Sequence, residues 1–523
     1  MQRFAIKEIT GNLLLMATLL LLAPATGRAA AGCDGVGNCY VRAGATGSGS
    51  GADWTNAYTK LPATLTRGVT YYLASGSYPS YFANTANSGT TTITIQAATA
   101  ASHGTATGWS ISYATDVTGP AVFLAGTGGT GLYFNYTSDY WIVNGNGSYA
   151  GMGCGPGGAG CNFKIDGSAC TNSQCHNLGL CEGAGYGWPS CPHDISVSYM
   201  EILGAGYAKA NVAWDNNVHD DSNGGTSSNG GGSNFTLSHL YIHGSSGVPI
   251  FTERASGITL DHSYILGNVS TSANHGEGWA DQATSNVTIS NNAWEDSEGS
   301  GFIVELDRGG CVATCTANNW QIYGNIFWYD NGNKLSCKSA PCNTGVGDGV
   351  IACINALICS NWKIYQNDMV NIIGYNAGLC EDCLDEGNVA STWTVENNLW
   401  WNNTYPGIVI GSGLPPCSTC TMTEDYNSFL GYNSGALSGF TGAHDVFIQS
   451  GPPNPFVGWA GSPPDFHLSA LNSDWTQGIT LPSPYNTDPD GRTRGGAGSW
   501  ARGAYEFVAG SPNAPANLQA VPH

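Results

Sequence analysis

A three-residue phrase with apolar residues at its first and third positions returns eight times along this chain. A period of two residues is typical of a β-strand that buries one face. Because one such unit cannot bury its apolar face alone, the recurrence predicts a solenoid whose stacked coils share a core. The phrases are Trp141-Ile142-Val143, Ile195-Ser196-Val197, Phe235-Thr236-Leu237, Ile258-Thr259-Leu260, Val287-Thr288-Ile289, Trp320-Gln321-Ile322, Trp362-Lys363-Ile364 and Trp393-Thr394-Val395.

A second apolar position accompanies every phrase except the first. It lies seven positions after the opening residue and predicts a further buried strand on each coil. The spacing between phrases is irregular, so we expect long loops between some strands. The residues at this second position are Ile202, Ile242, Ile265, Trp294, Phe327, Met369 and Trp400.

Asparagine stands five positions after the opening residue of four consecutive phrases, at Asn292, Asn325, Asn367 and Asn398. Asparagine tolerates left-handed backbone and can hydrogen-bond within its own turn. Coils stacked about 4.8 Å apart would also let these side chains pair as a ladder. We therefore predict an all-β chain folded as a right-handed parallel β-helix, a single-stranded solenoid. A β-propeller or β-sandwich fits the irregular spacing less well.

Segments before and after the repeats, taken together with them, resemble a known group of proteins. They are Tyr40-Val41-Arg42 through Tyr71-Tyr72-Leu73-Ala74 near the start, and Asp465-Phe466-His467-Leu468, Asp488-Pro489-Asp490-Gly491-Arg492 and Gly503-Ala504-Tyr505-Glu506 near the end. With the repeats, they resemble secreted bacterial parallel β-helix proteins of the superfamily that includes pectate-lyase-like and polygalacturonase-like enzymes. The resemblance covers nearly the whole chain after residue 31 and implies the fold and export, but identifies no specific family.

The first 31 residues have the composition of a secretory signal. Arg3 and Lys7 precede a mostly apolar run from Leu13 to Ala23, and Ala29-Ala30-Ala31 follows. We expect a secreted protein, extracellular or periplasmic, with no membrane span. One elongated domain is the simplest organisation: an N-terminal cap with the first coils at 32–110, further coils at 111–435, a closing segment at 436–508, and a linker or tail at 509–523 that could lead into another module.

All 18 cysteines follow the signal and fall into close pairs, which favours local disulfides in an exported chain. Closing such short loops removes little chain entropy, so these bonds are expected to staple the long loops. Zinc binding is the alternative for the last two pairs, whose spacing suits a metal. The predicted pairs are Cys33–Cys39, Cys154–Cys161, Cys170–Cys175, Cys181–Cys191, Cys311–Cys315, Cys337–Cys342, Cys353–Cys359, Cys380–Cys383 and Cys417–Cys420.

Charged residues make up only 10% of the chain, and its formal net charge is −21. Ordinary domains carry about 25% charged residues. A surface of this sign repels nucleic acid and acidic polymers, so we exclude nucleic acid as a partner. A neutral polysaccharide remains open, because 16 Trp and 25 Tyr supply flat apolar faces that suit sugar rings.

Four carboxylates follow a second group of apolar stretches, at Asp215, Glu253, Asp281 and Glu305. If these stretches align on consecutive coils, neighbouring carboxylates lie about 5 Å apart, as in retaining glycosidases, and alternate ones about 10 Å apart. Like charges this close must separate their pKa values or bind a cation. The competing interpretation is a solvated acidic face, and a shift of one residue in register would turn a side chain to the other face.

Neighbouring residues extend this candidate site. His275 and Glu277 flank a glycine that lets the backbone turn, and arginine is rare in this chain. The candidate catalytic residues are Asp215, Glu253, Asp281, Glu305, His275 and Glu277, and the candidate substrate-binding residues are Arg254, Arg308, Trp214 and Trp279.

Three functions remain open from the sequence. The favoured one is a glycoside hydrolase in which two of the four carboxylates act on a polysaccharide. The second is a polysaccharide lyase that uses Ca²⁺ or arginine, since Glu253, Arg254, Asp281 and Arg308 could imitate the roles found in pectate-lyase-like enzymes. Of the polygalacturonase motifs only Asp220-Asp221 is matched, so that mechanism is not implied. The third is a non-catalytic glycan-binding or matrix protein.

Overall fold

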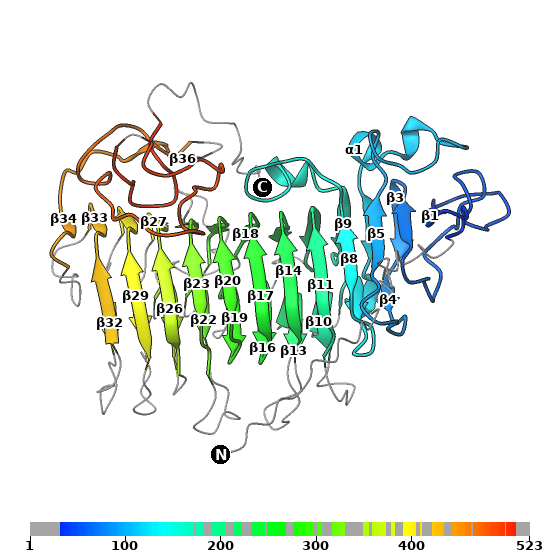
Figure 1. Ribbon diagram of the computed structural model, residues 1–523, viewed down its shortest axis with the longest axis horizontal. Helices are drawn as coiled ribbons and strands as arrows, with labels where there is room; N and C mark the ends of the chain where they lie inside the picture. Colours follow the sequence, from blue (N-terminus) through cyan, green and yellow to red (C-terminus); the bar gives the residue numbers. More distant parts are fainter. Residues whose placement is uncertain are drawn as a thin grey trace, which may run out of the picture.

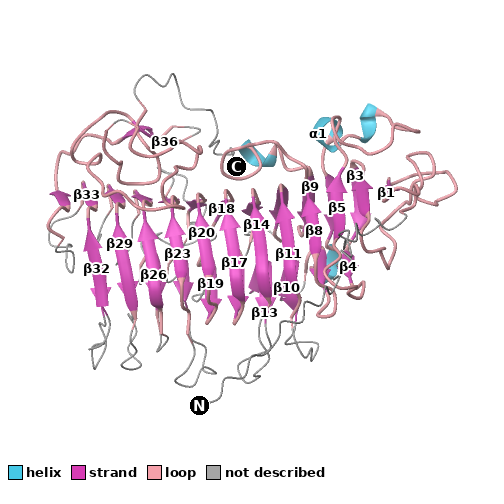
Figure 2. Cartoon of the chain, viewed as in Figure 1, coloured by secondary structure: helices cyan, strands magenta, loops and turns pink. Residues whose placement is uncertain are grey.

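The chain forms a rod built almost entirely from β-strands (Figures 1 and 2). Its computed structural model describes residues 32–171, 174–182, 191–205, 214–221, 232–245, 248–267, 276–297, 301–305, 316–329, 349–354, 358–372, 378–381, 391–403, 408–410, 421–432, 442–461, 464–496 and 498–508. Within them, three long parallel sheets, here called A, B and C, run along the rod. Successive strands pass from A to B to C on each coil, so the predicted right-handed parallel β-helix is confirmed.

Sheet A lies across the front of Figure 1 and contains every repeated phrase. The eight phrases fall on eight successive strands of this sheet, as the period of two predicts. Its strands are β1 (Asn38–Val41), β2 (Thr70–Leu73), β5 (Ile93–Ala97), β8 (Trp141–Asn144), β11 (His193–Ser198), β14 (Ser233–Ser238), β17 (Ser256–Asp261), β20 (Val287–Ser290), β23 (Trp320–Tyr323), β26 (Ser360–Tyr365), β29 (Thr392–Glu396) and β32 (Thr421–Asp425).

Sheet B carries the second apolar position of each coil, from Ile202 to Trp400, and all seven of these side chains are buried. Its strands are β3 (Gly76–Pro79), β6 (Ala121–Leu124), β9 (Phe163–Asp166), β12 (Met200–Leu203), β15 (Tyr241–His243), β18 (Tyr264–Leu266), β21 (Ala293–Glu295), β24 (Ile326–Trp328), β27 (Asp368–Val370), β30 (Leu399–Trp401), β33 (Ser428–Leu430) and β34 (Val446–Ile448). The stacking therefore continues as far as β34.

Sheet C closes each coil and carries the four predicted carboxylates. Its strands are β4 (Tyr81–Ala83), β7 (Leu132–Phe134), β10 (Gln174–Glu182), β13 (Trp214–Asp221), β16 (Ile250–Glu253), β19 (Trp279–Gln282), β22 (Ile303–Glu305), β25 (Ile351–Cys353), β28 (Leu379–Glu381) and β31 (Ile408–Ile410).

The interior of the rod is a column of stacked side chains that fills the space between the sheets. Trp320 stacks on Trp362 with ring centroids 4.7 Å apart, and Trp362 stacks on Trp393 at 5.0 Å. Buried aromatic rings remove large apolar areas from water, and such stacking adds to that gain. The tryptophans that open these phrases therefore belong to the core, as the period predicts.

The predicted asparagine ladder forms inside the turn between sheets A and B. Asn292 donates its side-chain amide to the Asn325 carbonyl oxygen at 3.0 Å, and Asn325 donates in the same way to Asn367 at 3.0 Å. The chain of bonds continues through Asn398 to Asn427. Each side-chain oxygen also accepts the backbone N–H of the preceding rung, so a buried turn has its polar groups satisfied.

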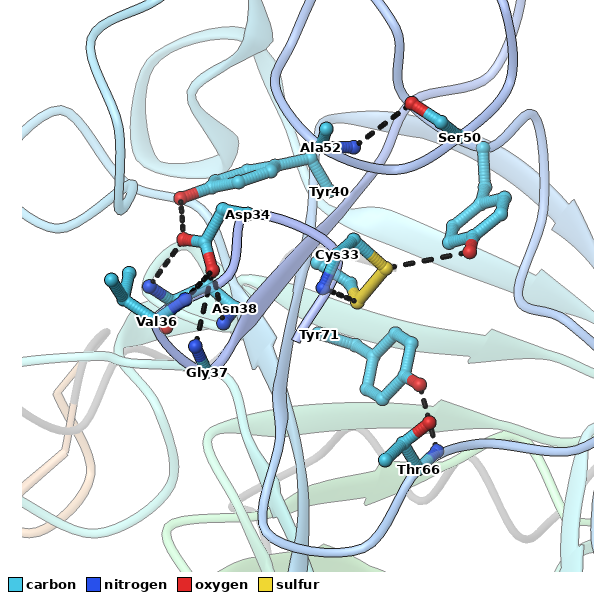
Figure 3. Close-up of a disulfide and its surroundings, with 12 residues drawn as sticks. Cys33, Asp34, Val36, Gly37, Asn38, Tyr40, Ser50, Ala52, Thr66 and Tyr71 are labelled. Carbon is cyan, nitrogen blue, oxygen red and sulfur yellow. Dashed lines mark hydrogen bonds between the residues drawn. A yellow bond between two sulfur atoms is a disulfide. The ribbon is translucent and has the colours of Figure 1, made fainter. Parts of the chain in front are cut away.

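Five of the predicted disulfides lie within the described residues, and all five form as paired from the sequence. The first, Cys33–Cys39, starts the stack (Figure 3). Inside its loop, the Asp34 carboxylate accepts the backbone N–H groups of Val36, Gly37 and Asn38. Each remaining pair has at least one cysteine outside the described residues, and the signal segment and the tail lie outside them entirely. The confirmed pairs are Cys33–Cys39, Cys154–Cys161, Cys170–Cys175, Cys181–Cys191 and Cys353–Cys359.

The closing segment folds back over the outer face of sheet B (Figure 1, orange to red). It contains the antiparallel pair β35 (Phe456–Gly458) and β36 (Asp465–Leu468). Phe466, Trp475 and Tyr505 bury their rings against the outer side chains of sheet B. Within the described ranges the one α-helix, α1 (Thr115–Thr118), lies on the same edge of the rod near its start. Among the described residues, no helix is both long and apolar enough to cross a bilayer.

Candidate functional site

The carboxyl ends of the sheet C strands bring part of the predicted acidic set together. Asp281 on β19 is the register partner of Glu305 on β22, so these two carboxylates lie on neighbouring coils. Parallel strands are about 4.8 Å apart, which gives the spacing expected for this pair. Asp281 is also the register partner of Thr252 on β16, and Thr252 is the partner of Asp220 on β13. The column therefore runs Asp220, Thr252, Asp281, Glu305.

The other two carboxylates do not belong to this column. Glu253 pairs in register with Gln282, one residue beyond the column, so its side chain belongs to the opposite face of the sheet. Asp215 pairs with Cys175 and lies near the start of β13. Because β13 is eight residues long, its residue in the column of Asp281 is Asp220, and not Asp215 as expected from the sequence. The predicted four-membered ladder is thus a two-membered one.

Both members of the pair point into the rod. Asp281 lies two residues after Trp279 and Glu305 two residues after Ile303, and both of those apolar side chains lie in the core. A strand alternates its faces, so the acids share the inward face. Asp281 and Glu305 are each 0% exposed. The carboxylates therefore lie in the interior and not on an open rim.

Hydrogen bonds within the turn account for this burial. The Thr252 hydroxyl accepts the Trp279 indole N–H at 2.7 Å and donates to an Asp281 oxygen. The second Asp281 oxygen accepts the Thr284 backbone N–H at 2.8 Å. Glu305 accepts the backbone N–H of Ala283 from the same turn. The two acids thus satisfy the backbone of the turn that follows β19, since a buried N–H without an acceptor would cost free energy.

Glu253 and Arg254 form a separate pair on the outer side. The Arg254 Nε lies 3.8 Å from Glu253 Oε1, and the Arg254 backbone has a positive φ of 52°. Positive φ is uncommon for a residue other than glycine. The Arg254 side chain is 18% exposed and that of Glu253 only 6%, so this pair is largely buried.

The remaining candidates are dispersed. Glu277 is fully buried two residues before β19, so it lies at the opposite end of the strand from Asp281. Trp279 is fully buried in the core and packs against Trp320 with centroids 5.8 Å apart, which leaves its ring no face for a sugar. The predicted stacking role of Trp279 is therefore corrected. Trp214 and Asp215 are described only as backbone of β13, and His275 and Arg308 lie outside the described residues.

The acidic pair does not provide a cation site in this arrangement. Both Asp281 oxygens and one Glu305 oxygen face N–H or O–H donors. A Ca²⁺ ion requires six to eight oxygen ligands directed toward it, whereas these oxygens are directed toward hydrogens. Among the described residues, no group of three or more His, Cys, Asp or Glu side chains could hold a metal ion.

A hydroxyl-rich column on the outer face of sheet A was missed by the search for charged residues. The middle residue of each repeated phrase points outward, and parallel register places these residues next to one another from coil to coil. Every member is half-buried or exposed. The signal was present in the sequence as the second residue of each phrase. The column consists of Thr94, Ile142, Ser196, Thr236, Thr259, Thr288, Gln321, Lys363, Thr394 and Thr423.

An amide ladder borders this column along the edge of sheet A that faces sheet C. Asn319 donates to the Asn286 side-chain oxygen at 2.9 Å, and Asn361 donates to Asn319 at 2.9 Å. All three have φ between 59° and 62°, a left-handed conformation that asparagine accepts more readily than most residues. The outer face of sheet A therefore offers hydroxyl and amide groups at the repeat of the coils, except at Gln321, whose side-chain oxygen accepts the Tyr485 hydroxyl of the closing segment at 2.7 Å.

A second unpredicted cluster joins the closing segment to the rod. His467 lies 2.7 Å from Asp465 and 2.9 Å from Asp490, and its side chain is 16% exposed. Burial alone would lower the pKa of His467, but the hydrogen bonds to the two carboxylates raise it to about 9. His262 on the rod contacts the Pro489 carbonyl oxygen at 3.0 Å. These contacts fasten the closing segment and explain why its sequence motifs contain paired His and Asp.

Comparison with known proteins gives relationships at the level of the fold. No protein-family model matches this chain. No curated protein matches it either. Among solved structures, the pectate lyase Pel9A aligns with a TM-score of 0.45 and 13% identity over 90% of this chain and 96% of that chain.

Two further solved structures align with this chain at lower similarity. The PL6 family alginate lyase AlyGC aligns with a TM-score of 0.35 and 10% identity over 77% of this chain, which spans 50% of the lyase chain. PfbA, a surface adhesin of Streptococcus pneumoniae, aligns with a TM-score of 0.31 and 12% identity over 71% of this chain and 84% of that chain. The parallel β-helix fold itself follows from the three parallel sheets of this chain.

Proposed function

We propose that this protein is a secreted carbohydrate-binding β-helix that holds an extended neutral polysaccharide along the outer face of sheet A. The observation that carries the proposal is the outward column from Thr94 to Thr423, whose members keep parallel register over ten strands. At about 4.8 Å per strand the column is about 43 Å long. A polymer with regularly spaced hydroxyl groups suits such a repeating row of donors and acceptors.

The chemistry of this face favours a neutral polymer. Hydroxyl and amide side chains donate and accept hydrogen bonds without carrying charge. Lys363 is the one charged member of the column, in a chain whose formal net charge is −21. Acidic polysaccharides would be repelled by that net charge at low ionic strength. The signal-like residues 1–31 agree with a protein that meets such polymers outside the cell.

The test is affinity electrophoresis of the protein in gels that contain neutral glucan, xylan, mannan or galactan, with pectate and alginate as acidic comparisons. We expect retardation by at least one neutral polymer and weaker retardation by the acidic ones. The triple variant Thr236→Val, Thr259→Val, Thr288→Val removes three hydroxyls and keeps the β-branched shape. Losing three hydrogen bonds worth about 1 kcal/mol each predicts binding at least tenfold weaker.

The matched control carries serine at the same three positions and should bind nearly as well as the wild type. Equal binding by the valine and serine variants would refute the role of this face. So would a wild type that migrates identically in every gel.

Hydrolysis is the second and less supported candidate, because Asp281 and Glu305 are register partners at the spacing of a retaining pair but are both buried inside the rod. Asp281→Asn and Glu305→Gln would then abolish the release of reducing ends from a neutral polysaccharide while the fold persists. A lyase would instead release an unsaturated product that absorbs in the ultraviolet, which is the outcome expected if Arg254 acts on a uronate. The absence of both products with every polymer would leave binding as the function.

A further inference from the structure

A hollow lies where the sheet B strands β30, β33 and β34 end. Its volume is about 570 Å³, within the range of small-molecule sites, which is about 300–1,000 Å³. Its lining comes from the last residue of β30 and from residues that follow the three strands. They are Trp401, Asn402, Gly431, Tyr432, Gln449, Ser450, Gly451 and Pro452.

The hollow exists because an amide ladder is interrupted there. Asn402 donates its side-chain amide to the Asn371 oxygen at 2.9 Å, and both residues have positive φ at the end of their strands. Trp401 pairs in register with Leu430, and Leu430 with Ile448. The next positions are therefore Asn402, Gly431 and Gln449. Gly431 has no side chain that could donate to the Asn402 carbonyl oxygen, so a gap one coil wide separates two amide side chains.

Two aromatic residues border this gap. Trp401 lies against Trp459 with centroids 4.8 Å apart and against Phe456 at 6.2 Å, both in edge-to-face orientations. Tyr432 packs against the inner core of the rod. Trp401 and Tyr432 remain half-buried, in contrast to the fully buried Trp328 on the same outer column. Aromatic side chains held in this way lose little conformational entropy when a ligand binds.

The lining also restricts the charge of the ligand. The eight described residues that border the hollow include no acidic or basic side chain. They provide two amides, a serine hydroxyl and two aromatic rings. A sugar ring matches this set, because its C–H faces pack on aromatic rings and its hydroxyls pair with amides.

We propose that this hollow is a binding site for a neutral sugar ring, with Trp401 and Tyr432 as the apolar border and Asn402 and Gln449 as hydrogen-bonding partners. One sugar hydroxyl donates to the Asn402 carbonyl oxygen and thus takes the place of the rung that Gly431 lacks. The site lies at the end of the sheet B strands, apart from the outer column of sheet A, and does not rest on the function proposed for that column.

The experiment measures binding of neutral glucose-, xylose-, mannose-, galactose- and N-acetylglucosamine-based hexasaccharides by isothermal titration calorimetry. We expect at least one to bind the wild type, and Trp401→Ala to weaken that binding at least tenfold. The decisive variant is Gly431→Asn. A Cβ at Gly431 meets nothing closer than Pro452 Cγ at 3.4 Å, and asparagine already occupies the left-handed position at Asn371 and Asn402.

Gly431→Asn should therefore fold normally, complete the amide ladder, occupy the gap beside Asn402 and reduce sugar binding at least tenfold. The matched control is Gly491→Asn, because Gly491 also has positive φ and open space around it but lies outside the hollow. The control should bind as the wild type does. Wild-type affinity in Gly431→Asn, or no binding of any hexasaccharide to the wild type, would overturn the proposal.

The valine triple variant of sheet A separates the two proposals. It should still bind the hexasaccharide at the hollow, whereas Gly431→Asn should still be retarded by polymer in the gel. Loss of hexasaccharide binding in the sheet A variant would place the ligand on that face and refute the hollow as its site.

Discussion

The two polar turns of the rod satisfy their buried backbone groups with opposite chemistry. Between sheets A and B, asparagine side chains pass hydrogen bonds from coil to coil, because an amide carries both a donor and an acceptor. After the sheet C strands, carboxylates offer acceptors alone, and the pair Asp281 and Glu305 depends on donors from Thr252 and the backbone. An amide turn can therefore repeat without limit, whereas an acidic turn cannot extend beyond the donors around it.

The largest effect is expected from placing an acid in the amide turn. Asn325→Asp would put an acceptor where Asn325 now donates to Asn367, Ile289 and Tyr323, and would leave a charge in a fully buried position. We expect a loss of about 4–5 kcal/mol in the free energy of unfolding, measured by urea denaturation. The matched control is Asn361→Asp on the exposed ladder, which should cost less than about 1 kcal/mol.

Replacing an acid by an amide in the turn after β19 should reduce the free energy of unfolding only slightly. In Asp281→Asn the amide oxygen can still accept the Thr284 N–H, while the new N–H₂ can donate to the Thr252 hydroxyl. We expect a cost of about 1 kcal/mol, against about 3 kcal/mol for Asp281→Ala, which leaves the Thr284 N–H without its acceptor. Urea denaturation of the two variants measures the difference. Equal destabilisation would mean that the negative charge, and not the hydrogen bonding, holds this turn.

The amide turn was predictable and the acidic turn was not, for physical reasons. Asn292 and its successors keep a fixed distance from their phrases, so one alignment of sheet A also aligns the ladder. Sheet C strands are joined to the phrases by segments of variable length, so their register could not be derived by counting. Thr252 takes the position expected for Glu253, and Asp220 the position expected for Asp215.

The sequence also did not reveal that the Asp281 and Glu305 side chains point into the rod. Asp281 follows Trp279 at the inward spacing, yet a carboxylate is normally expected on the solvent side. Asp281 is buried because its carboxylate accepts the Thr284 backbone N–H of the turn after β19. Hydrophobic periodicity does not predict the geometry of such a turn. The hollow beside Trp401 depends on contacts between three coils and could not be found from the chain order.

In the closing segment, carboxylate acceptors also depend on a donor, but this donor is a histidine whose protonation changes with pH. His467 donates to Asp465 and Asp490, and its folded-state pKa of about 9 exceeds the ordinary value of 6.5. The stabilisation is therefore complete below about pH 6.5 and is lost as pH rises through 9, with a magnitude of about 2–3 kcal/mol. Hydrogen exchange of residues 464–496 should become faster between pH 6 and pH 10, relative to the core strands. His467→Gln should abolish this additional pH dependence, and an unchanged profile in that variant would contradict the assignment.

The smallest effect is expected at the last rung of the amide turn, where Asn427 donates its backbone N–H to Asp445 at 2.7 Å. Burial, followed by the neighbouring Glu424, raises the pKa of Asp445 to about 7. The folded protein thus retains a proton that the unfolded chain releases above about pH 4, so this residue makes stability fall as pH rises from 4 to 7.

Asp445→Asn keeps the acceptor and removes the charge. Thermal and urea unfolding should show no change at pH 4 and a gain of about 1 kcal/mol at pH 8, since partial exposure screens the charge. If the variant loses stability at both pH values, an amide cannot replace the Asp445 carboxyl as the acceptor of the Asn427 backbone N–H, and the prediction is contradicted.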